Sequence, residues 1–366
     1  MHKLAIYPFT KSSFPLCEFF PIFQQEYELT DLVSPVGLGL AGHDAGHATN
    51  RSNLGITVHS DISKAIDECD ALLVPFGDLK NDLAFRDAFS IMNNVAQQGK
   101  TVFCAPRLTH SQYQKLHSAG QSFYYGFQEK PYRAQYATTS RYTPRAPVVF
   151  IHNLTVEADS LEVTLSLAQR FCRDGFRVSV IGARPEYNFL GMNGSSLLLN
   201  SFYGSQRLHS ITQAIQAFHY YLRTVEISQK PDVILINIPG AAVSTQQLYY
   251  SESGVYLYLM TQIVRPDYAI VCMPYTEFAG DSFQVISKEL HAKFGCGIDL
   301  LHLSNKFVHV EQTRHTGKEQ TFYIPEQEAV QKALELRTEN IPVYCALKQE
   351  ERELLYQGLL NTLTVD

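Results

Sequence analysis

The chain has 366 residues, of which 45% are hydrophobic and 18% charged, and 30 basic against 36 acidic side chains give it a formal net charge of −6. This is the composition of an ordinary globular protein, so disorder is excluded, and at about 100–200 residues per domain the length predicts two or three domains. The mild acidity argues against a nucleic-acid-binding protein, because it provides no general attraction to phosphates. The seven cysteines stand singly and in odd number, which indicates neither a disulfide framework nor a zinc ribbon.

The first eight residues hold one basic residue and no long apolar run behind it, so they do not predict a signal peptide. The longest apolar runs, such as 233–236 and 269–273, are far shorter than the ~20 residues that span a bilayer. We therefore expect a cytoplasmic protein that does not use a membrane as a partner.

Strand-like and helix-like segments alternate over the first hundred residues. The strands are continuous apolar runs, as in a parallel sheet that helices cover on both faces. The expected strands are 3–7, 27–33, 55–58, 71–75 and 101–104, and the expected helices are 62–68 and 82–98. This alternation predicts a Rossmann-like α/β domain over residues 1–108.

Residues 109–146 show no clear hydrophobic period, and we interpret them as the segment that connects two domains. Interleaved tyrosines and basic residues would suit a surface for a peptide or a partner protein. A connection packed onto its own domains is the alternative. The residues concerned are Tyr124, Tyr125, Lys130, Tyr132, Arg133, Tyr136, Arg141, Tyr142 and Arg145.

The alternation restarts after residue 146 and continues to the end of the chain. The expected strands are 147–151, 176–181, 232–238, 268–273, 297–303, 321–324 and 342–347. The expected helices are 160–174, 208–228, 254–264, 282–294, 326–337 and 349–363. This predicts a second parallel α/β domain over residues 147–366, of the P-loop type.

The loop after the strand 147–151 stands where a P-loop protein places its phosphate cradle. The motif GxxxxGK[ST] needs glycines for close backbone approach, a lysine for charge and a hydroxyl for magnesium. Here Asn153 and Asp159 stand where glycines belong, and Ser160 stands where the lysine belongs. Asp159 would repel a phosphate, so we expect it to cap the following helix. The candidate binding residues of this loop are His152, Asn153, Thr155, Glu157, Asp159 and Ser160.

The strand 232–238 resembles the second signature of the same fold, in which an acid at the strand end faces magnesium ahead of a Pro-Gly turn. Here the residue is Asn237, and an amide cannot neutralise magnesium as a carboxylate does. Two departures at independent positions predict a degenerate P-loop domain without ordinary ATP hydrolysis. Gly240 and Ser253 complete its candidate residues, and the turn 303–306 resembles the base-recognition turn of some nucleotide-binding proteins.

A glycine-rich loop follows the second strand. The spacing of its first three glycines matches GxGxxG, but neither a helix pattern behind it nor an acid after the next strand supports a dinucleotide site. Its two histidines and one aspartate are metal-ligating types, yet no HExxH helix presents them, so we expect no metal. We interpret it as a structured binding loop with the candidate residues Ser34, Gly37, Gly39, Gly42, His43, Asp44 and His47.

With these residues in view, the chain resembles the bacterial peptide maturation system family, encoded in natural-product cassettes beside a bacteriocin-like precursor and a radical-SAM enzyme. The resemblance spans most of the chain and implies a role in making a ribosomally synthesised, post-translationally modified peptide. It implies no catalytic residues. The matching stretches are 7–9, 34–35, Gly37, 39–40, Gly42, 44–46, 55–58, 68–70, 147–150, 230–234, 238–240 and 265–267.

A second similarity, over 253–271, connects this architecture to a two-domain family with an N-terminal Rossmann domain and a C-terminal P-loop domain. That resemblance implies amino-acid ligation or acylation. The departures at Asn153, Asp159, Ser160 and Asn237 count against the use of a nucleotide, and not against the fold.

The sequence leaves three hypotheses open. The leading one is an accessory protein that binds the precursor peptide or the modifying enzyme, without ordinary ATP hydrolysis and without a cofactor, as a monomer or a homo-oligomer. The rival is an ATP-dependent ligase or a group-transfer enzyme. In a third, the loop of His43 and His47 holds a metal that a partner needs. The residues available to an enzyme are Ser34, His43, Asp44, Glu157 and Asp159.

Overall fold

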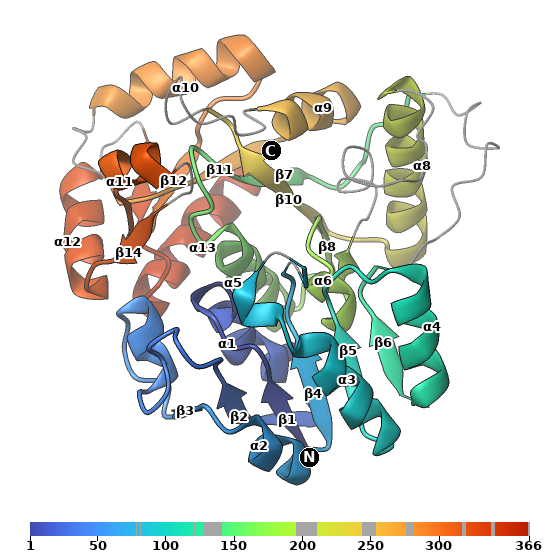
Figure 1. Cartoon of the computed structure of the whole chain (residues 1–366). Helices are drawn as coiled ribbons and strands as arrows, with labels where there is room; N and C mark the ends of the chain where they lie inside the picture. The colour runs from blue at the N-terminus through green and yellow to red at the C-terminus, as the bar shows by residue number, and fades with distance from the viewer. Residues whose placement is uncertain are drawn as a thin grey trace. The chain divides into compact units, whose positions relative to one another are not determined.

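In the computed structural model, the described residues divide into two compact units. One unit combines Met1–Glu129 with Arg184–Ser196, and the other combines Lys130–Ala183 with Leu197–Asp366. Each unit is built on its own sheet (Figure 1). The described residues are 1–77, 79–80, 82–120, 122–127, 141–194, 211–243, 254–275, 281–316, 320–337 and 341–364.

The first unit contains a parallel six-stranded sheet. Its strands are β1 (His2–Ile6), β2 (Tyr27–Val33), β3 (Val58–His59), β4 (Ala71–Val74), β5 (Thr101–Cys104) and β6 (Phe123–Tyr125). They pair in the order β3-β2-β1-β4-β5-β6. This is the strand order of the dinucleotide-binding Rossmann fold, in which the chain reverses its direction of travel between β1 and β4. The expected Rossmann-like sheet is confirmed.

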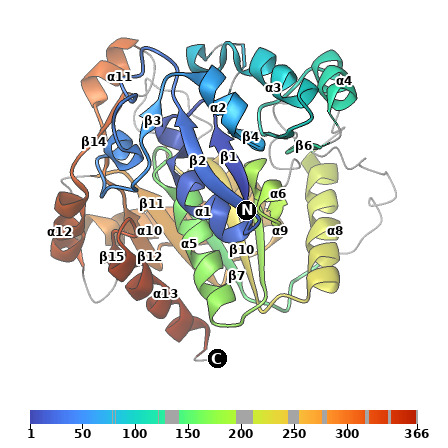
Figure 2. The ribbon, with the colours of Figure 1, turned by 90° about the horizontal axis from the view of Figure 1, so that it is seen from below.

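Helices cover both faces of the first sheet (Figure 2). One face packs against α2 (Ile62–Glu68), α3 (Ala88–Gln97) and α4 (His110–Ala119), and shares its buried core with them. On the other face lies α1 (Phe14–Phe23), whose Phe20 ring meets Phe103 of β5 edge-on at 5.4 Å between centroids. Alternate side chains of each strand therefore serve two apolar layers, which explains why the strands are apolar throughout.

Several elements of the first unit differ from the sequence prediction. The expected helix 82–98 is a short 3₁₀ turn, η3 (Leu83–Phe85), followed by α3, and α1 forms although it contains Pro21. Part of the expected connection 109–146 is regular structure, because it contains α4 and β6. A capping box between Thr109 and Gln112 starts α4, and Leu116 is its one fully buried residue, so no apolar period is visible in its sequence.

The second unit is built on the other sheet. Its strands are β7 (Val148–Asn153), β8 (Val178–Gly182), β10 (Val233–Ala241), β11 (Tyr268–Met273), β12 (Leu300–Leu303) and β15 (Val343–Tyr344). Within this unit the strands pair in the order β15-β12-β11-β7-β10-β8. The pairings from β15 to β8 are all parallel. The expected α/β class with two parallel sheets is confirmed.

The first strand of the second unit lies in the middle of its sheet. The chain runs from β7 to β8 and β10 on one side, and then crosses to β11, β12 and β15 on the other. The loop that leaves the carboxyl end of β7 therefore lies at a topological switch point, where open α/β sheets bind their ligands. This loop leads directly into α5 (Ser160–Arg173).

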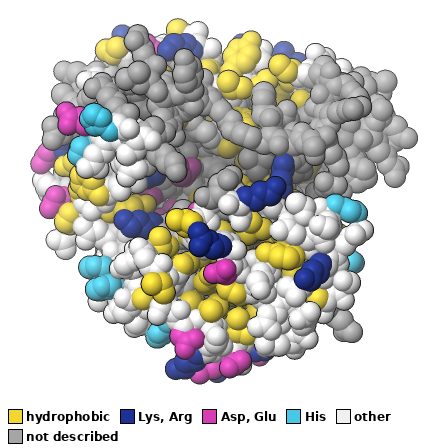
Figure 3. All heavy atoms as spheres, viewed as in Figure 1, with side chains coloured by type: hydrophobic (Ala, Val, Ile, Leu, Met, Phe, Trp, Pro, Cys, Tyr) yellow, Lys and Arg dark blue, Asp and Glu magenta, His cyan; other side chains and the backbone are white. Residues whose placement is uncertain are grey.

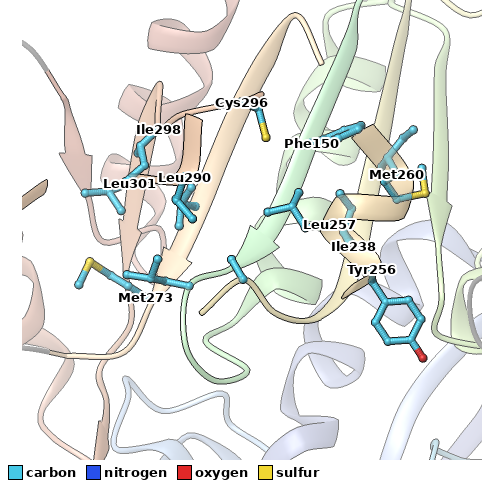
Figure 4. Packing of buried hydrophobic residues seen from close by; sticks show 14 of the residues in the cluster. Phe150, Ile238, Tyr256, Leu257, Met260, Met273, Leu290, Cys296, Ile298 and Leu301 are labelled. Carbon is cyan, nitrogen blue, oxygen red and sulfur yellow. The ribbon is translucent and has the colours of Figure 1, made fainter. Parts of the chain in front are cut away.

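Two helix layers enclose the second sheet. One layer consists of α8 (Ile211–Gln229), α9 (Val255–Ile263), α10 (Asp281–Phe294) and α12 (Glu326–Leu336). Figure 4 shows this core from close by, with Phe150, Ile238 and Leu257 among its buried side chains. The other layer contains α5 and, beside it, α13 (Gln349–Leu363), whose Tyr356 ring packs edge-on against Phe171.

Smaller elements complete the described chain. They are η1 (Lys11–Ser13), η2 (Ala45–Thr49), α6 (Glu186–Phe189), α11 (Val310–Thr316) and an antiparallel pair, β13 (Lys306–Val308) with β14 (Thr321–Tyr323). All seven cysteines are free thiols, and only Cys172 is exposed. Among the described helices, none is long and apolar enough to cross a membrane.

Candidate functional site

The loop between β7 and α5 is folded over the side chain of Asn153. Asn153 Oδ1 accepts a hydrogen bond from the Ala158 N–H at 2.9 Å, and Asn153 Nδ2 donates to Glu157 Oε2 at 3.0 Å and to Ser160 Oγ at 3.2 Å. At the start of the loop, the Leu154 N–H donates to the Cys272 carbonyl of the neighbouring strand at 2.7 Å. The loop is therefore shaped by its own side chains. Asn153 performs this organising role from the end of the central strand.

The start of α5 corrects the motif alignment expected from the sequence. The phosphate motif has four residues between its glycines, followed at once by lysine and the hydroxyl. Counted from Asn153, the second glycine position is Ala158, the lysine position is Asp159 and the hydroxyl position is Ser160, the first residue of α5. Ser160 therefore occupies the hydroxyl position and not the lysine position. The lysine is replaced by an acid.

The carboxylate of Glu157 lies at the N-terminus of α5. Glu157 Oε1 accepts hydrogen bonds from the Ser160 N–H at 3.2 Å and from Ser160 Oγ at 2.9 Å, and Oε2 accepts from Asn153 Nδ2. The free N–H groups and the dipole of a helix N-terminus attract anions, and this is where P-loop proteins hold phosphate. Here the Glu157 carboxylate accepts hydrogen bonds from the donors of Ser160.

Asp159 does not cap α5 as expected. It stands at the N-cap position in the left-handed conformation, with φ +65°, and makes no side-chain capping bond. Instead, Asp159 Oδ2 lies 3.3 Å from Nε2 of His302, a fully buried residue of β12. His302 Nδ1 accepts the Ala346 N–H at 3.1 Å, so the ring proton resides on Nε2 and is donated to Asp159. Glu157, and not Asp159, accepts the free N–H group of Ser160 at the start of α5.

The turn 303–306 contacts the same loop from another strand end. Lys306 Nζ donates to the backbone carbonyl of Glu157 at 2.7 Å, while Ser304 Oγ accepts the Lys306 N–H at 3.0 Å. Asn305 Nδ2 donates to the Ile324 carbonyl at 2.9 Å. These contacts fix the turn against the protein, and Lys306 fixes the main chain at Glu157.

Two buried polar groups lie beside the loop without a hydrogen-bond partner among the described residues. Asn237, near the end of β10, is 4% exposed and its Nδ2 is unpartnered; His152, on β7, is 1% exposed and its Nε2 is unpartnered. Burial lowers the pKa of His152 to about 4, so the ring is neutral at pH 7. An unsatisfied buried polar group costs about 1–3 kcal/mol, and in a native structure it calls for a ligand or a water.

Successive side chains of a strand point to opposite faces of the sheet, and this places Asn237 on the α5 side. Its neighbours Ile236 and Ile238 belong to the core that α8 and α9 cover, so Asn237 points the opposite way. Asn237 is in register with Ile151, two residues before Asn153 on β7. Its amide therefore lies on the face of the sheet from which Asn153 reaches the start of α5.

The remaining candidates of this unit contribute little to the loop. Thr155 is half-buried within it. Gly240 has φ +75°, and a Cβ there would meet the ring of Tyr256 at 3.4 Å. Ser253 lies outside the described residues.

The glycine-rich loop belongs to the first unit and is closed on Asp44. Asp44 Oδ1 accepts the N–H groups of Gly46 and Leu54, and Oδ2 accepts that of Gly55, each at 2.8 Å. Burial acts to raise the pKa of Asp44, but the backbone hydrogen bonds outweigh it, and the pKa is lowered. The carboxylate is thus committed to holding the loop, and it starts η2 as its N-cap.

The other candidate residues of this loop are not arranged as in a dinucleotide-binding motif. Gly37, Gly39 and Gly42 have positive φ and open space around them, but the loop follows β2, whereas the dinucleotide motif follows the first strand. The rings of the exposed His43 and His47 stack at 4.6 Å between centroids. Ser34 is fully buried at the end of β2, and among the described residues its Oγ has no partner.

A segment from later in the chain covers the carboxyl ends of β4 and β6 in the first unit. Glu186 Oε1 accepts the N–H of Phe76, which follows β4, and Asn188 Nδ2 donates to the carbonyl of Gly126, which follows β6. A Cβ at Gly126 would lie 2.5 Å from Cβ of Pro185, so the close approach needs glycine. Glu186 is buried and paired with Arg184 at 2.8 Å.

Sequence reasoning missed Glu186 and His302, which shape these loops, and it singled out the turn of Lys306 without predicting the contact of Lys306 with Glu157. Each acts on a partner more than 100 positions away, so no local motif announces it. A buried histidine in an apolar strand was the only visible signal for His302. A shallow hollow of about 410 Å³ lies elsewhere, lined by Ser287, Lys288, His291, Ala292, Gly297, Ile298 and Asp299.

Comparison with known proteins gives the fold. No family model matches the sequence, and no curated protein matches it significantly. The crystal structure of a DUF1611 family protein from Anabaena variabilis is similar over 99% of this chain and 100% of that chain, with a TM-score of 0.60 and 10% identity. The structure of a GTPase in apo form from Pyrococcus abyssi aligns with 60% of this chain and 98% of that chain, with a TM-score of 0.31 and 14% identity. The first similarity shows a shared fold over the whole chain.

Proposed function

We propose that the chain is an accessory protein in the maturation of a ribosomally synthesised, post-translationally modified peptide. It binds the precursor peptide or the modifying enzyme without ordinary ATP hydrolysis. The observation that supports the second part most directly is the carboxylate of Glu157, which accepts the Ser160 donors where a P-loop protein would hold phosphate.

Electrostatics add to this argument. A nucleotide phosphate would meet the carboxylates of Glu157 and Asp159 at the loop, with Asp159 standing at the lysine position. Two like unit charges 4 Å apart repel by about 4 kcal/mol at the effective dielectric constant near a protein surface. Asn237 supplies no negative charge with which to hold magnesium. Nucleotide binding in the ordinary mode is therefore unfavourable.

A role in binding is supported by the surface of the glycine-rich loop. Val36 is 91% exposed and Leu38 is 43% exposed, while Asp44 fixes the loop behind them. Hydrophobic side chains are visible on the surface of the first unit (Figure 3). Exposed apolar side chains on a preorganised loop favour contact with another chain. The resemblance to the peptide maturation family supplies the identity of that chain.

The test is direct binding to the neighbours that the resemblance implies. The proposal expects a short precursor peptide and a radical-SAM enzyme to be encoded beside the gene, and at least one of them to bind the purified protein at micromolar concentration. The Val36→Ser/Leu38→Ser variant should weaken that binding, whereas Leu334→Ser, a change at another exposed leucine, should not. If the protein binds neither the precursor peptide nor the enzyme, the proposal is contradicted.

One observation favours the rival, an ATP-dependent ligase or group-transfer enzyme. Ser160 retains the hydroxyl position of the phosphate motif, and the Lys306 ammonium reaches the loop from outside it. Such an enzyme would bind magnesium and ATP together and would lose that binding in Ser160→Ala. Calorimetric titration of the wild type and of Ser160→Ala with magnesium and ATP separates the two functions.

A further inference from the structure

Three hydrogen-bond donors converge on the carboxylate of Glu157. They are the Ser160 N–H, Ser160 Oγ and Asn153 Nδ2, at 3.2, 2.9 and 3.0 Å. We propose that this oxyanion seat is a ligand site, that Glu157 fills it in the resting protein, and that the carboxylate of a bound ligand replaces Glu157. The inference rests on the proposed function, because it assigns the same loop to a binding partner instead of a nucleotide.

A second, independent observation points to a ligand at this seat. Asn237 Nδ2 is a buried donor for which the described residues offer no acceptor. It lies on the α5 side of the sheet, on the strand next to the one that ends in Asn153. An oxyanion that sits deeper than the Glu157 carboxylate would give this donor its acceptor. The resting arrangement, by contrast, pays the cost of an unsatisfied amide.

Glu157 is placed so that it can leave the seat. The residue is exposed, and within the described part of the chain no ion pair holds its carboxylate. Its main chain is fixed separately, because Lys306 Nζ binds the carbonyl. A rotation of the side chain would therefore free the donors of Ser160 and Asn153 without unfolding the loop.

The chemistry of the surroundings favours a carboxylate over a phosphate. Asp159 and the displaced Glu157 both remain nearby and repel a dianion more strongly than a monoanion. A peptide carries such monoanions at its C-terminus and at its acidic side chains. The probes below compare a carboxylate with a phosphate.

The experiment removes the resting occupant and titrates small oxyanions. Glu157→Ala and wild type are titrated with acetate, a monoanion, and, separately, with inorganic phosphate, and binding is followed by chemical-shift changes. Glu157→Ala should bind acetate at least tenfold more tightly than wild type does. A preference for acetate supports a carboxylate ligand, and a preference for phosphate would contradict it.

Two further variants keep the test decisive. Glu350→Ala removes an exposed acid from the first turn of another helix, α13, and should leave binding as in wild type. Glu157→Ala/Asn237→Leu should lose at least tenfold of the gained affinity. If Glu157→Ala destabilises the fold, Glu157→Gln, which can keep an oxygen toward Ser160 but loses the charge, should still gain binding.

The failure of this inference is distinct from failure of the proposed function. A folded Glu157→Ala protein that binds neither probe better than Glu350→Ala would overturn the oxyanion seat. Binding of magnesium and ATP to the wild type would contradict the proposed function instead.

Discussion

Each of the two units carries a loop that looks in sequence like a ligand cradle, and in each unit a carboxylate of the loop accepts the loop's own N–H groups. In the first unit, Asp44 binds the N–H groups of Gly46, Leu54 and Gly55. In the second, Glu157 binds the N–H and hydroxyl of Ser160.

The difference lies in what the carboxylate does for the fold. Asp44 is half-buried and joins segments ten residues apart through three backbone hydrogen bonds, so the loop depends on it. Glu157 acts across three residues and is exposed. It also stands near a buried amide that lacks a partner among the described residues, Asn237. The first carboxylate is therefore part of the architecture, whereas the second is an occupant that can be exchanged.

The largest expected effect concerns the helix that carries the second loop. Glu162, in the first turn of α5, is fully buried and paired with Arg352 at 2.7 Å. Removing one partner of a buried pair costs about 3–5 kcal/mol, so Glu162→Ala should lower the free energy of unfolding by that amount in urea denaturation. The more exposed pair of Arg170 and Glu353 is the control, because Glu353→Ala should cost less than about 1 kcal/mol. An equal decrease in the free energy of unfolding for Glu162→Ala and Glu353→Ala would show that Glu162 does not anchor the helix.

A second prediction tests how tightly the first loop is built. A Cβ at Gly46 would lie far inside van der Waals contact with the Ser52 carbonyl, whereas Gly39 has open space around it. Gly46→Ala should destabilise the first unit by about 3 kcal/mol. Gly39→Ala has only its positive φ against it and should cost about 1 kcal/mol. Thermal unfolding with limited proteolysis measures both, and a Gly39→Ala protein less stable than Gly46→Ala would contradict the described loop.

The third prediction uses pH to test the role of the Asp44 carboxylate. The pKa of Asp44 is lowered in the folded protein, so its contribution to stability is present above the ordinary aspartate pKa of about 4. That contribution disappears as the pH falls through the folded pKa. Asp44→Asn should lose about 2 kcal/mol at pH 7, and its stability should fall less steeply than that of wild type below pH ~5. Parallel stability curves in acid would contradict this role.

The smallest expected effect is at Asn237. Leucine has a similar size and removes the unpartnered donor, so Asn237→Leu should change the free energy of unfolding by less than about 1 kcal/mol, or raise it. Asn153→Leu is the matched control, because that amide holds Ala158, Glu157 and Ser160. It should cost about 1–3 kcal/mol. A large loss from Asn237→Leu in urea unfolding would mean that its amide has a partner in the resting protein.

The sequence predicts the layout of both sheets, because buried parallel strands are apolar runs between helices. It also locates the loop after β7 and identifies Asp159 and Asn237 as departures from the phosphate motif. It does not reveal α4, which buries a single residue fully, or the contact of His302 with Asp159, which are 143 positions apart. The roles of Asp44 and Glu157 depend on which way a carboxylate turns. Composition and spacing do not determine that direction.

The measurement that tests the central claim most directly is calorimetric titration of the wild-type protein with ATP or GTP in the presence of magnesium. The account predicts no saturable binding at millimolar nucleotide, because Glu157 occupies the N-terminus of α5 and Asp159 replaces the lysine. Saturable binding that disappears in Ser160→Ala would show that the loop after β7 is a nucleotide site after all.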